Sequence, residues 1–402
     1  MSSFRRLIGL ILIALVAPTL AWADGPRRVL HVSLYPYIPN AAAAALTLKQ
    51  GFERDHPDVI VDITLNPHYY DLDPAAGGIL YEDADVHEID VVFLGDFLAQ
   101  HRLAPLSKAL QASLGPYTAR AAEAATVDGQ LVAAPQWLCS DFLIYRADQT
   151  GLDGSDTLAG MEAALAPAGH GLLMDMGGTD GLGELYLSFL VARDGQPDKA
   201  LASVTPTPDP AVLDRIQRIL ALEPAGFGRS ADYHERGVFY ARQFARRSGA
   251  AFVGYSEMIH EVLDEGAVSC RVEDHCVGAG DIRVAAFPFE DHKVRPMVWV
   301  DMFGVDAKTT GQTRADAEAF IGYAVSDAAY RALLIPQPGE APRYLLPATE
   351  APFHDPQILA AAPLYPKFHA IIDQGVVVST PHLTARLHDV ASQIDADLPK
   401  TH

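Results

Sequence analysis

The chain has 402 residues, of which 49% are hydrophobic and 20% are charged, and its formal net charge at pH 7 is −21. Nucleic acids and anionic membranes reward a basic face, so this acidic balance makes both of them poor partners. The negative electrostatic field of such a protein would attract a small cationic ligand, although exported proteins are often acidic for solubility alone.

The first residues have the organisation of a secretory signal peptide. Arg5 and Arg6 precede an apolar run over residues 7–16, which is shorter than the ~20 residues that a membrane-spanning helix needs. We expect residues 1–23 to be removed and the chain to be periplasmic or secreted. The two arginines are the only charged residues in that segment, so the remaining chain carries a formal charge of −23.

Alternating strand and helix patterns follow the signal peptide. We predict a strand over residues 29–34, a helix over 41–52 capped by Asn40, a strand over 59–65 and a buried strand over 89–94. This alternation favours parallel βαβ units. Ligands of such sheets meet the loops at the carboxyl ends of strands, where Tyr35, Tyr37 and Asp96 fall.

Residues 134–146 predict an aromatic-rich strand that carries Cys139, a cysteine with no partner nearby in the sequence. Free cysteine is among the most buried residue types, so a small buried hydrophobe is one interpretation of this thiol. The other interpretation is that the Cys139 thiol is reactive. The histidines form no recognisable motif of a cysteine protease, which argues against that class.

The later chain continues the α/β pattern. Strands are predicted over residues 171–176, 282–287 and 297–305, a strand–turn–helix over 250–260, and helices over 182–192, 211–222, 233–247, 314–325 and 383–394. Ser256 is a suitable N-cap, which would place Glu257 in the first turn of its helix. An acid there complements the helix dipole, and that structural role is one interpretation of Glu257.

Cys270 and Cys276 flank five residues and are predicted to close a short loop as a disulfide. A metal site that adds Asp274 and His275 is the alternative, but this spacing is unusual for zinc. We therefore favour the disulfide, which leaves Cys139 free.

The whole pattern predicts an α/β protein with two lobes and a central ligand cleft, because roughly 380 residues exceed what one hydrophobic core usually serves. Strand crossovers between the lobes are expected around residues 134–143 and 294–303. The expected division assigns residues 24–138 and 298–335 to lobe 1, and residues 139–297 and 336–402 to lobe 2.

The order of elements resembles the type II periplasmic substrate-binding proteins, of which maltose-binding protein is the familiar example. Four segments resemble one enzymatic branch of that fold, thiaminase I (thiamine pyridinylase), in the same order and at similar spacing. They are Tyr35-Pro36-Tyr37, Asp90 before an apolar run, Pro135-Gln136-Trp137-Leu138-Cys139, and Gly254-Tyr255-Ser256-Glu257. Trp299 stands where the resemblance leads us to expect another tyrosine.

The resemblance implies specific roles for cleft residues. Cys139 would be the nucleophile and Glu257 the base, and the residues that hold thiamine would be Tyr35, Tyr37, Asp90, Tyr255 and Asp301. Burial among aromatic side chains should raise the pKa of Glu257 toward neutrality. Cys139 is then expected to ionise as its proton moves to Glu257.

The implied reaction displaces the thiazole of thiamine through a covalent Cys–pyrimidine intermediate and transfers the pyrimidine to an amine or thiol. A thiolate is a strong nucleophile, and a carboxylate can accept its proton. Tyrosine faces attract flat cations such as thiamine. We expect no cofactor and no metal, and a monomer whose ligands are thiamine and a small nucleophile.

A non-catalytic substrate-binding protein for thiamine or another small cation is the alternative. Such a protein needs neither a thiol nor a base, so Cys139 together with Glu257 favours the enzyme. The departure at Trp299 also leaves open an enzyme that uses the same mechanism on another heteroaromatic substrate.

Overall fold

The computed structural model describes residues 26–73, 78–79, 82–168, 171–177, 179–224, 233–269, 276–292 and 295–398. The predicted signal peptide, residues 1–23, lies outside the described residues, and so does Cys270 of the predicted disulfide. Cys276 is disulfide-bonded, and the identity of its partner stays a prediction. Within the described segments, no helix has the length and apolar character that crossing a membrane requires.

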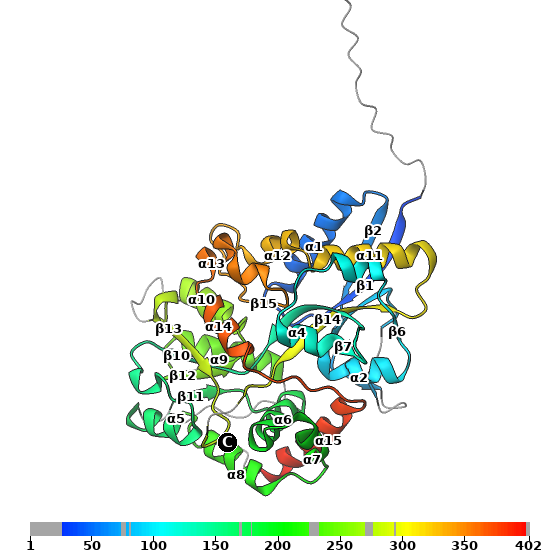
Figure 1. Ribbon diagram of the computed structural model, residues 1–402. Helices are drawn as coiled ribbons and strands as arrows, with labels where there is room; N and C mark the ends of the chain where they lie inside the picture. The colour runs from blue at the N-terminus through cyan, green and yellow to red at the C-terminus, as the bar shows by residue number, and fades with distance from the viewer. Residues whose placement is uncertain are drawn as a thin grey trace, which may run out of the picture.

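Two β-sheets form the centres of two lobes (Figure 1). The larger sheet contains, in spatial order, β15 (Leu346–Pro347), β9 (Ala134–Cys139), β14 (Trp299–Asp306), β5 (Val86–Asp90), β1 (Arg28–Leu34) and β2 (Val59–Leu65), with β6 (Leu103–Ala104) beside β14. The smaller sheet contains β11 (Leu172–Met174), β12 (Ala251–Gly254), β10 (Phe142–Arg146) and β13 (Ile282–Ala286). Two short hairpins, β3 (Leu72–Asp73) with β4 (Gly78–Ile79) and β7 (Thr126–Val127) with β8 (Gln130–Leu131), lie apart from both sheets.

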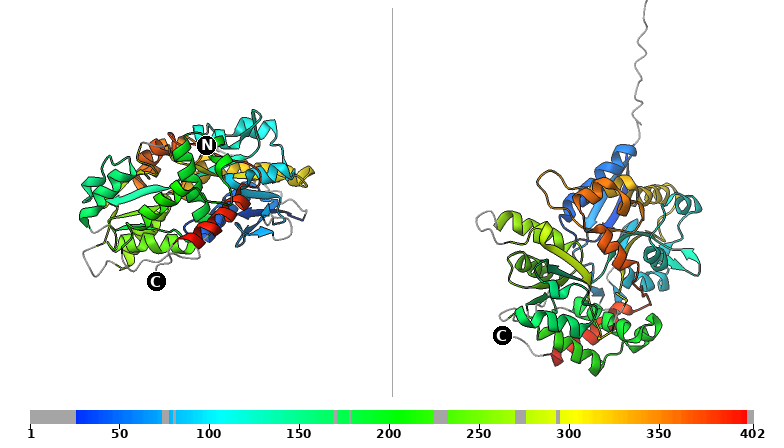
Figure 2. Two further views of the ribbon diagram at one scale, coloured as in Figure 1. Left: turned by 90° about the horizontal axis from the view of Figure 1, so that it is seen from below. Right: turned by 60° about the vertical axis from the view of Figure 1, so that its left-hand side comes forward.

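Helices surround both sheets (Figure 2). Those before β11 are α1 (Ala41–Asp55), α2 (Val91–Ala99), α3 (Lys108–Ser113), α4 (Ala119–Ala125) and α5 (Leu158–Leu165). Between β11 and β14 lie α6 (Thr179–Asp194), α7 (Pro197–Ser203), α8 (Pro210–Leu220), α9 (Tyr233–Ala245) and α10 (Met258–Ser269). The C-terminal helices are α11 (Gly311–Ala324), α12 (Asp327–Leu334), α13 (Pro356–Ala361), α14 (Tyr365–Ile372) and α15 (Leu383–Asp397). Most predicted elements are therefore present, with ends shifted by a few residues.

The N-terminal part of the larger sheet has the predicted parallel pairing. β1 pairs in parallel with both β2 and β5, and α1 connects β1 to β2. The predicted cap of α1 is wrong in one respect. Asn40 precedes the helix in a left-handed conformation, with φ of 53°, but its side chain makes no capping hydrogen bond.

The predicted strand over residues 89–94 is wrong beyond Asp90. β5 ends at Asp90 and α2 begins at the next residue, Val91. The Asp90 carboxylate accepts a hydrogen bond from the Val92 N–H at 3.0 Å and so acts as the N-cap of α2. This capping fixes Asp90 at the carboxyl end of a strand, where a cleft residue is expected.

The chain crosses between the sheets at two connections. Only Ser140 and Asp141 separate β9 in the larger sheet from β10 in the smaller one, and the chain returns between β13 and β14. These connections agree with the predicted crossovers. The Ser140 hydroxyl donates to the Met297 carbonyl oxygen at 2.6 Å, so the two crossovers are also bonded to each other.

The C-terminal tail contacts both lobes. β15 pairs with β9 in the larger sheet, although residues 336–402 were expected in lobe 2. α15 packs against α6, beside which it lies in Figure 1, and it also contacts α2. Just before α15, the His382 N–H donates to the Asp96 carboxylate at 2.8 Å. The residue boundaries of the two lobes otherwise stay a prediction.

Candidate active site

A small cavity lies between the two sheets and is lined by residues from both. Its volume is about 30 Å³. The lining residues are Tyr35, Ile38, Tyr70, Asp90, Trp137, Leu138, Cys139, Glu184, Tyr255, Glu257, Trp299, Asp301 and Leu345. We call this space the cleft. Six of the seven residues predicted for catalysis or thiamine binding lie here, from segments that are far apart in the sequence.

The remaining predicted residue, Tyr37, does not line the cleft. Its ring packs edge-on against Tyr35, with centroids 5.4 Å apart, and stacks on Tyr70 at 6.3 Å. Tyr37 is therefore positioned to support cleft tyrosines, and 36% of its surface is exposed.

Cys139 is the last residue of β9, and it pairs across the sheet with Trp299 of β14. The thiol is free and partly buried. Burial raises its pKa well above the ordinary value, and the charges of Glu257 and Asp301 raise it further. A resting thiolate is thus disfavoured, so reaction at this sulfur needs a base that takes the proton.

Glu257 lies in the turn between β12 and α10, one residue before the helix begins. The Ser256 hydroxyl donates to the Glu257 carboxylate at 3.4 Å. Burial raises the pKa of Glu257 to about 7, in agreement with the expected direction. This carboxylate can accept a proton near neutral pH.

Asp90 and Asp301 face each other as paired residues of β5 and β14. Burial raises the pKa of Asp90 to about 6, and the Tyr70 hydroxyl donates to its carboxylate at 3.1 Å. Burial also raises the pKa of Asp301 well above its ordinary value, with a further increase from the charge of Asp90. Neighbouring carboxylates resist joint ionisation, so this pair can offer both a donor and an acceptor to a ligand.

Tyr69 and Tyr70 are functional candidates that the sequence analysis missed. The Asp90 N–H donates to the Tyr69 hydroxyl at 2.6 Å, and the Tyr69 ring lies 5.0 Å from that of Tyr35. Both tyrosines follow β2 by a few residues, at the same edge of the sheet as Tyr35. Their place after the carboxyl end of a predicted strand was the signal that could have identified them.

Glu88 was also missed, and it orients the first cleft tyrosine. Its carboxylate accepts the Tyr35 N–H at 2.8 Å. Burial raises the pKa of Glu88 to about 8. Glu88 belongs to β5 but precedes the strand predicted over residues 89–94 by one residue, so the sequence analysis assigned it no role.

Glu184 is a further acid that sequence reasoning did not select. It lies on α6, and the Tyr255 hydroxyl donates to its carboxylate at 3.1 Å. The signal was available, since Glu184 is an isolated acid in the apolar helix predicted over residues 182–192. Its charge contributes to the raised pKa values of Cys139 and Asp301.

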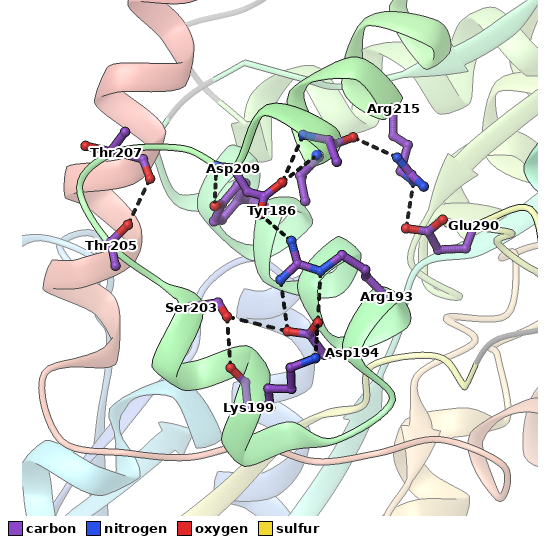
Figure 3. Close-up of polar contacts among 12 residues, drawn as sticks. Tyr186, Arg193, Asp194, Lys199, Ser203, Thr205, Thr207, Asp209, Arg215 and Glu290 are labelled. Carbon is purple, nitrogen blue, oxygen red and sulfur yellow. Dashed lines mark hydrogen bonds and ion pairs between the residues drawn. The ribbon is translucent and has the colours of Figure 1, made fainter.

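Polar contacts anchor the end of α6 to the start of α8 (Figure 3). Arg193 pairs with both Asp194 and Asp209, and the Asp209 N–H donates to the Tyr186 hydroxyl at 2.9 Å. The Asp209 carboxylate also caps α8. These contacts fix the helix that carries Glu184 into the cleft.

Comparisons with known proteins test the resemblance to thiaminase I and the resemblance to type II periplasmic substrate-binding proteins. No protein-family model matches the sequence. The chain is 27% identical over 382 residues to Thiaminase-1 of Paenibacillus thiaminolyticus, which covers 90% of this chain and 87% of that protein. The predicted resemblance to thiaminase I is thereby confirmed at the level of sequence.

Solved structures confirm the fold. Thiaminase I from Bacillus thiaminolyticus matches with a TM-score of 0.75 at 22% identity, over 92% of this chain and 99% of that one. Clostridium botulinum thiaminase I in complex with thiamin matches with a TM-score of 0.74 at 18% identity, over the same shares. Maltose-bound MalE3 of T. maritima matches with a TM-score of 0.66 at 17% identity, over 92% and 100%. The chain therefore has the two-lobed fold of type II periplasmic binding proteins.

Proposed function

From this likeness to thiaminase I, we propose that the chain is a thiamine pyridinylase, a transferase that exchanges the thiazole of thiamine for another nucleophile. One observation carries the proposal. A free thiol, Cys139, and a carboxylate with a pKa near neutrality, Glu257, line the same cleft in a chain that resembles Thiaminase-1 along 90% of its length.

The first half of the reaction forms the covalent intermediate. Glu257 takes the proton of the Cys139 thiol, and the sulfur bonds to an electron-poor carbon next to a ring nitrogen of the pyrimidine. The ring π electrons shift and break the bond between the bridging methylene and the thiazolium nitrogen. The thiazole leaves as a neutral molecule with that electron pair, and the pyrimidine remains on sulfur with an exocyclic double bond.

The second half transfers the pyrimidine. An amine or thiol bonds to the methylene carbon, the π electrons return to the ring, and the carbon–sulfur bond breaks. Protonated Glu257 returns its proton to the departing thiolate and then accepts the proton that the new nucleophile loses. Two easier displacements replace one difficult step.

Substrate recognition falls to the acids and aromatic rings of the cleft. The carboxyl groups of Asp90 and Asp301 can exchange hydrogen bonds with an aminopyrimidine. The faces of Tyr35 and Tyr255 suit a flat, positively charged ligand. Glu184 adds a negative charge on the side of the smaller sheet, where it can attract the thiazolium.

The cleft must widen before such a ligand enters. Its volume of about 30 Å³ is far below the ~300 Å³ or more of typical small-molecule sites. Rotation of the two lobes about the paired crossovers would open it, as hinge motions do in two-lobed proteins. Closure over bound thiamine would then keep water from the intermediate.

We also propose that the mature chain is exported and acts as a monomer on thiamine and a small nucleophile, with Cys270 and Cys276 joined as a disulfide. The signal-peptide pattern and the acidic charge support export. Mass spectrometry of non-reduced peptides tests the disulfide, and amino-terminal sequencing of the protein secreted by a host tests removal of residues 1–23.

The activity is tested by incubating the mature protein with thiamine, with and without aniline, and following thiamine by mass spectrometry. We expect rapid loss of thiamine with aniline, formation of the aniline adduct, and no reaction by the Cys139→Ser variant. Tight binding without consumption would instead identify a substrate-binding protein. Equal consumption by Cys139→Ser would remove Cys139 from the mechanism.

A further inference from the structure

Trp299 occupies a position in the cleft that no predicted role explains. It is the first residue of β14 and the cross-strand partner of Cys139. Paired residues of antiparallel strands project from the same face of the sheet, with Cβ atoms about 4.5–5.5 Å apart. Asp301, two residues along β14, shares that face. The indole therefore lies beside the Cys139 thiol. It also shares a face of the sheet with Asp301, whose carboxyl group is proposed to hold the substrate.

The indole N–H of Trp299 is buried without a hydrogen-bond partner. The side chain is 3% exposed, and no acceptor bonds to Nε1 among the described residues. A buried Trp N–H usually has a hydrogen-bond partner, and leaving it unsatisfied has a cost in stability. The protein tolerates this cost at a position that lines the cleft.

Among the described residues, no tyrosine hydroxyl of the cleft accepts a hydrogen bond from the indole N–H. The Tyr70 hydroxyl donates to Asp90, and the Tyr255 hydroxyl donates to Glu184. Indole nitrogen can donate but cannot accept, unlike the phenol that the resemblance leads us to expect here. Trp299 thus favours a ligand that presents a hydrogen-bond acceptor to the indole N–H.

We propose that Trp299 is a specificity-determining residue whose indole N–H donates to an unprotonated ring nitrogen of the bound heteroaromatic substrate. This inference rests on the proposed function, because attack by Cys139 is what brings the ring beside β14. The acceptor is the ring nitrogen next to the attacked carbon, since that atom lies closest to the sulfur. A ring that carries C–H or N–H at this place leaves the indole unsatisfied and binds less tightly.

The test compares two ligands on the mature Cys139→Ser protein, which removes turnover. Calorimetry measures the dissociation constants of thiamine and of an analogue in which C–H replaces the ring nitrogen next to the attacked carbon. We expect thiamine to bind ~10-fold more tightly, as one hydrogen bond of ~1.4 kcal/mol provides. Adding Trp299→Phe should bring the ratio of the two constants close to one.

The ratio is measured within each variant, so a general loss of stability does not alter its meaning. Trp137→Phe is the matched control, because it shortens another tryptophan of the same cleft and should keep the preference. An unchanged ratio in Trp299→Phe would overturn the role of Trp299 while leaving the proposed function intact. If the Cys139→Ser protein binds neither compound, the result would overturn the proposed function, and the proposed hydrogen bond from Trp299 to the substrate would fall with it.

Discussion

Cys139 and Glu257 share an acidic cleft, and the two groups respond to it in complementary ways. Burial and neighbouring charges keep the thiol protonated, while burial brings the Glu257 carboxyl group to a pKa of about 7. A base of this strength can remove the thiol proton as the sulfur attacks and return it as the sulfur leaves. The chemistry therefore depends on proton exchange between these residues.

Replacement of Glu257 tests this exchange. Glu257→Gln keeps the size and hydrogen-bonding capacity of the side chain but cannot take a proton. We expect turnover of thiamine to fall ~10²–10⁴-fold, while the dissociation constant of thiamine changes little. Steady-state kinetics and calorimetry measure the two quantities. A variant that keeps wild-type turnover would exclude Glu257 as the base.

The pH dependence of activity follows from the same carboxyl group. Glu257 acts only when ionised, so kcat/KM with aniline as acceptor should be low at pH 5, rise through pH values near 7 and level off above. Aniline is mostly unprotonated at pH 5 and fully so above pH 6, so the rise near pH 7 reports the titration of the enzyme. A profile that is flat between pH 5 and pH 8 would contradict the assigned role.

Several site residues were predictable from the sequence, and others were not. Cys139 and Glu257 stood in segments that resemble thiaminase I, and the structure brings them to one cleft. Glu184 and Tyr70 reach the same cleft from α6 and from the loop after β2. Their position in the sequence made them candidates, but neither lies in a segment with a known motif, and only the packing of the two lobes shows that they reach the cleft.

Helices and strands position the cleft residues through local capping and close packing. The junction of β5 and α2 shows why the sequence pattern predicted a strand where a helix begins. Residues 91–97 are all buried, so the run lacks the helical periodicity that would distinguish it from a strand. Asp90 before that run was the N-cap signal of a helix, and its functional interpretation obscured its structural role.

Gly95 on α2 tests how the C-terminal tail is fixed to the larger lobe. A Cβ atom there would lie 2.4 Å from the Thr380 carbonyl carbon and 2.5 Å from the Pro381 nitrogen. Gly95→Ala should therefore lower the free energy of unfolding by about 1–3 kcal/mol, despite its better helix propensity.

Gly280→Ala is the matched control, because a Cβ atom at that residue meets nothing within 4 Å. Its stability should stay within about 0.5 kcal/mol of the wild type. Urea denaturation measures both variants. If Gly95→Ala proves as stable as Gly280→Ala, then the tail does not pack closely on α2.

At the scale of the whole molecule, the two-lobed fold and its crossovers were predictable from alternating strands and helices. The order of the larger sheet was not. β9 and β14 are neighbours although 159 residues, 140–298, lie between the end of β9 at Cys139 and the start of β14 at Trp299, and β15 contains only two residues. Long-range pairing of this kind leaves no periodic signal in either segment.

The buried acids of the cleft should also govern how stability depends on pH. The pKa values of Asp90, Glu257 and Glu88 are raised to about 6, 7 and 8, so the folded chain binds these protons more tightly than the unfolded chain does. Their stabilising contribution is complete below their ordinary pKa values of ~4 and is lost as pH rises through 6 to 8. We expect the free energy of unfolding to fall by several kcal/mol between pH 5 and pH 8.

Glu88→Gln should reduce this fall, because the variant has no charge to bury at high pH. Asp83→Asn serves as the control, since the Asp83 side chain is 95% exposed and should not alter the pH dependence. Urea denaturation at several pH values provides the comparison. Stability that rises from pH 5 to pH 8 would contradict the protonation states assigned to the cleft.

The central claim is that Cys139 carries the pyrimidine between the two halves of the reaction. Its most direct test is mass spectrometry of the mature protein mixed with thiamine in the absence of an acceptor, followed by peptide mapping. The account predicts a mass gain of one pyrimidinylmethyl group on the peptide that contains Cys139, and its disappearance when aniline is added. Consumption of thiamine with Cys139 unmodified throughout would contradict it.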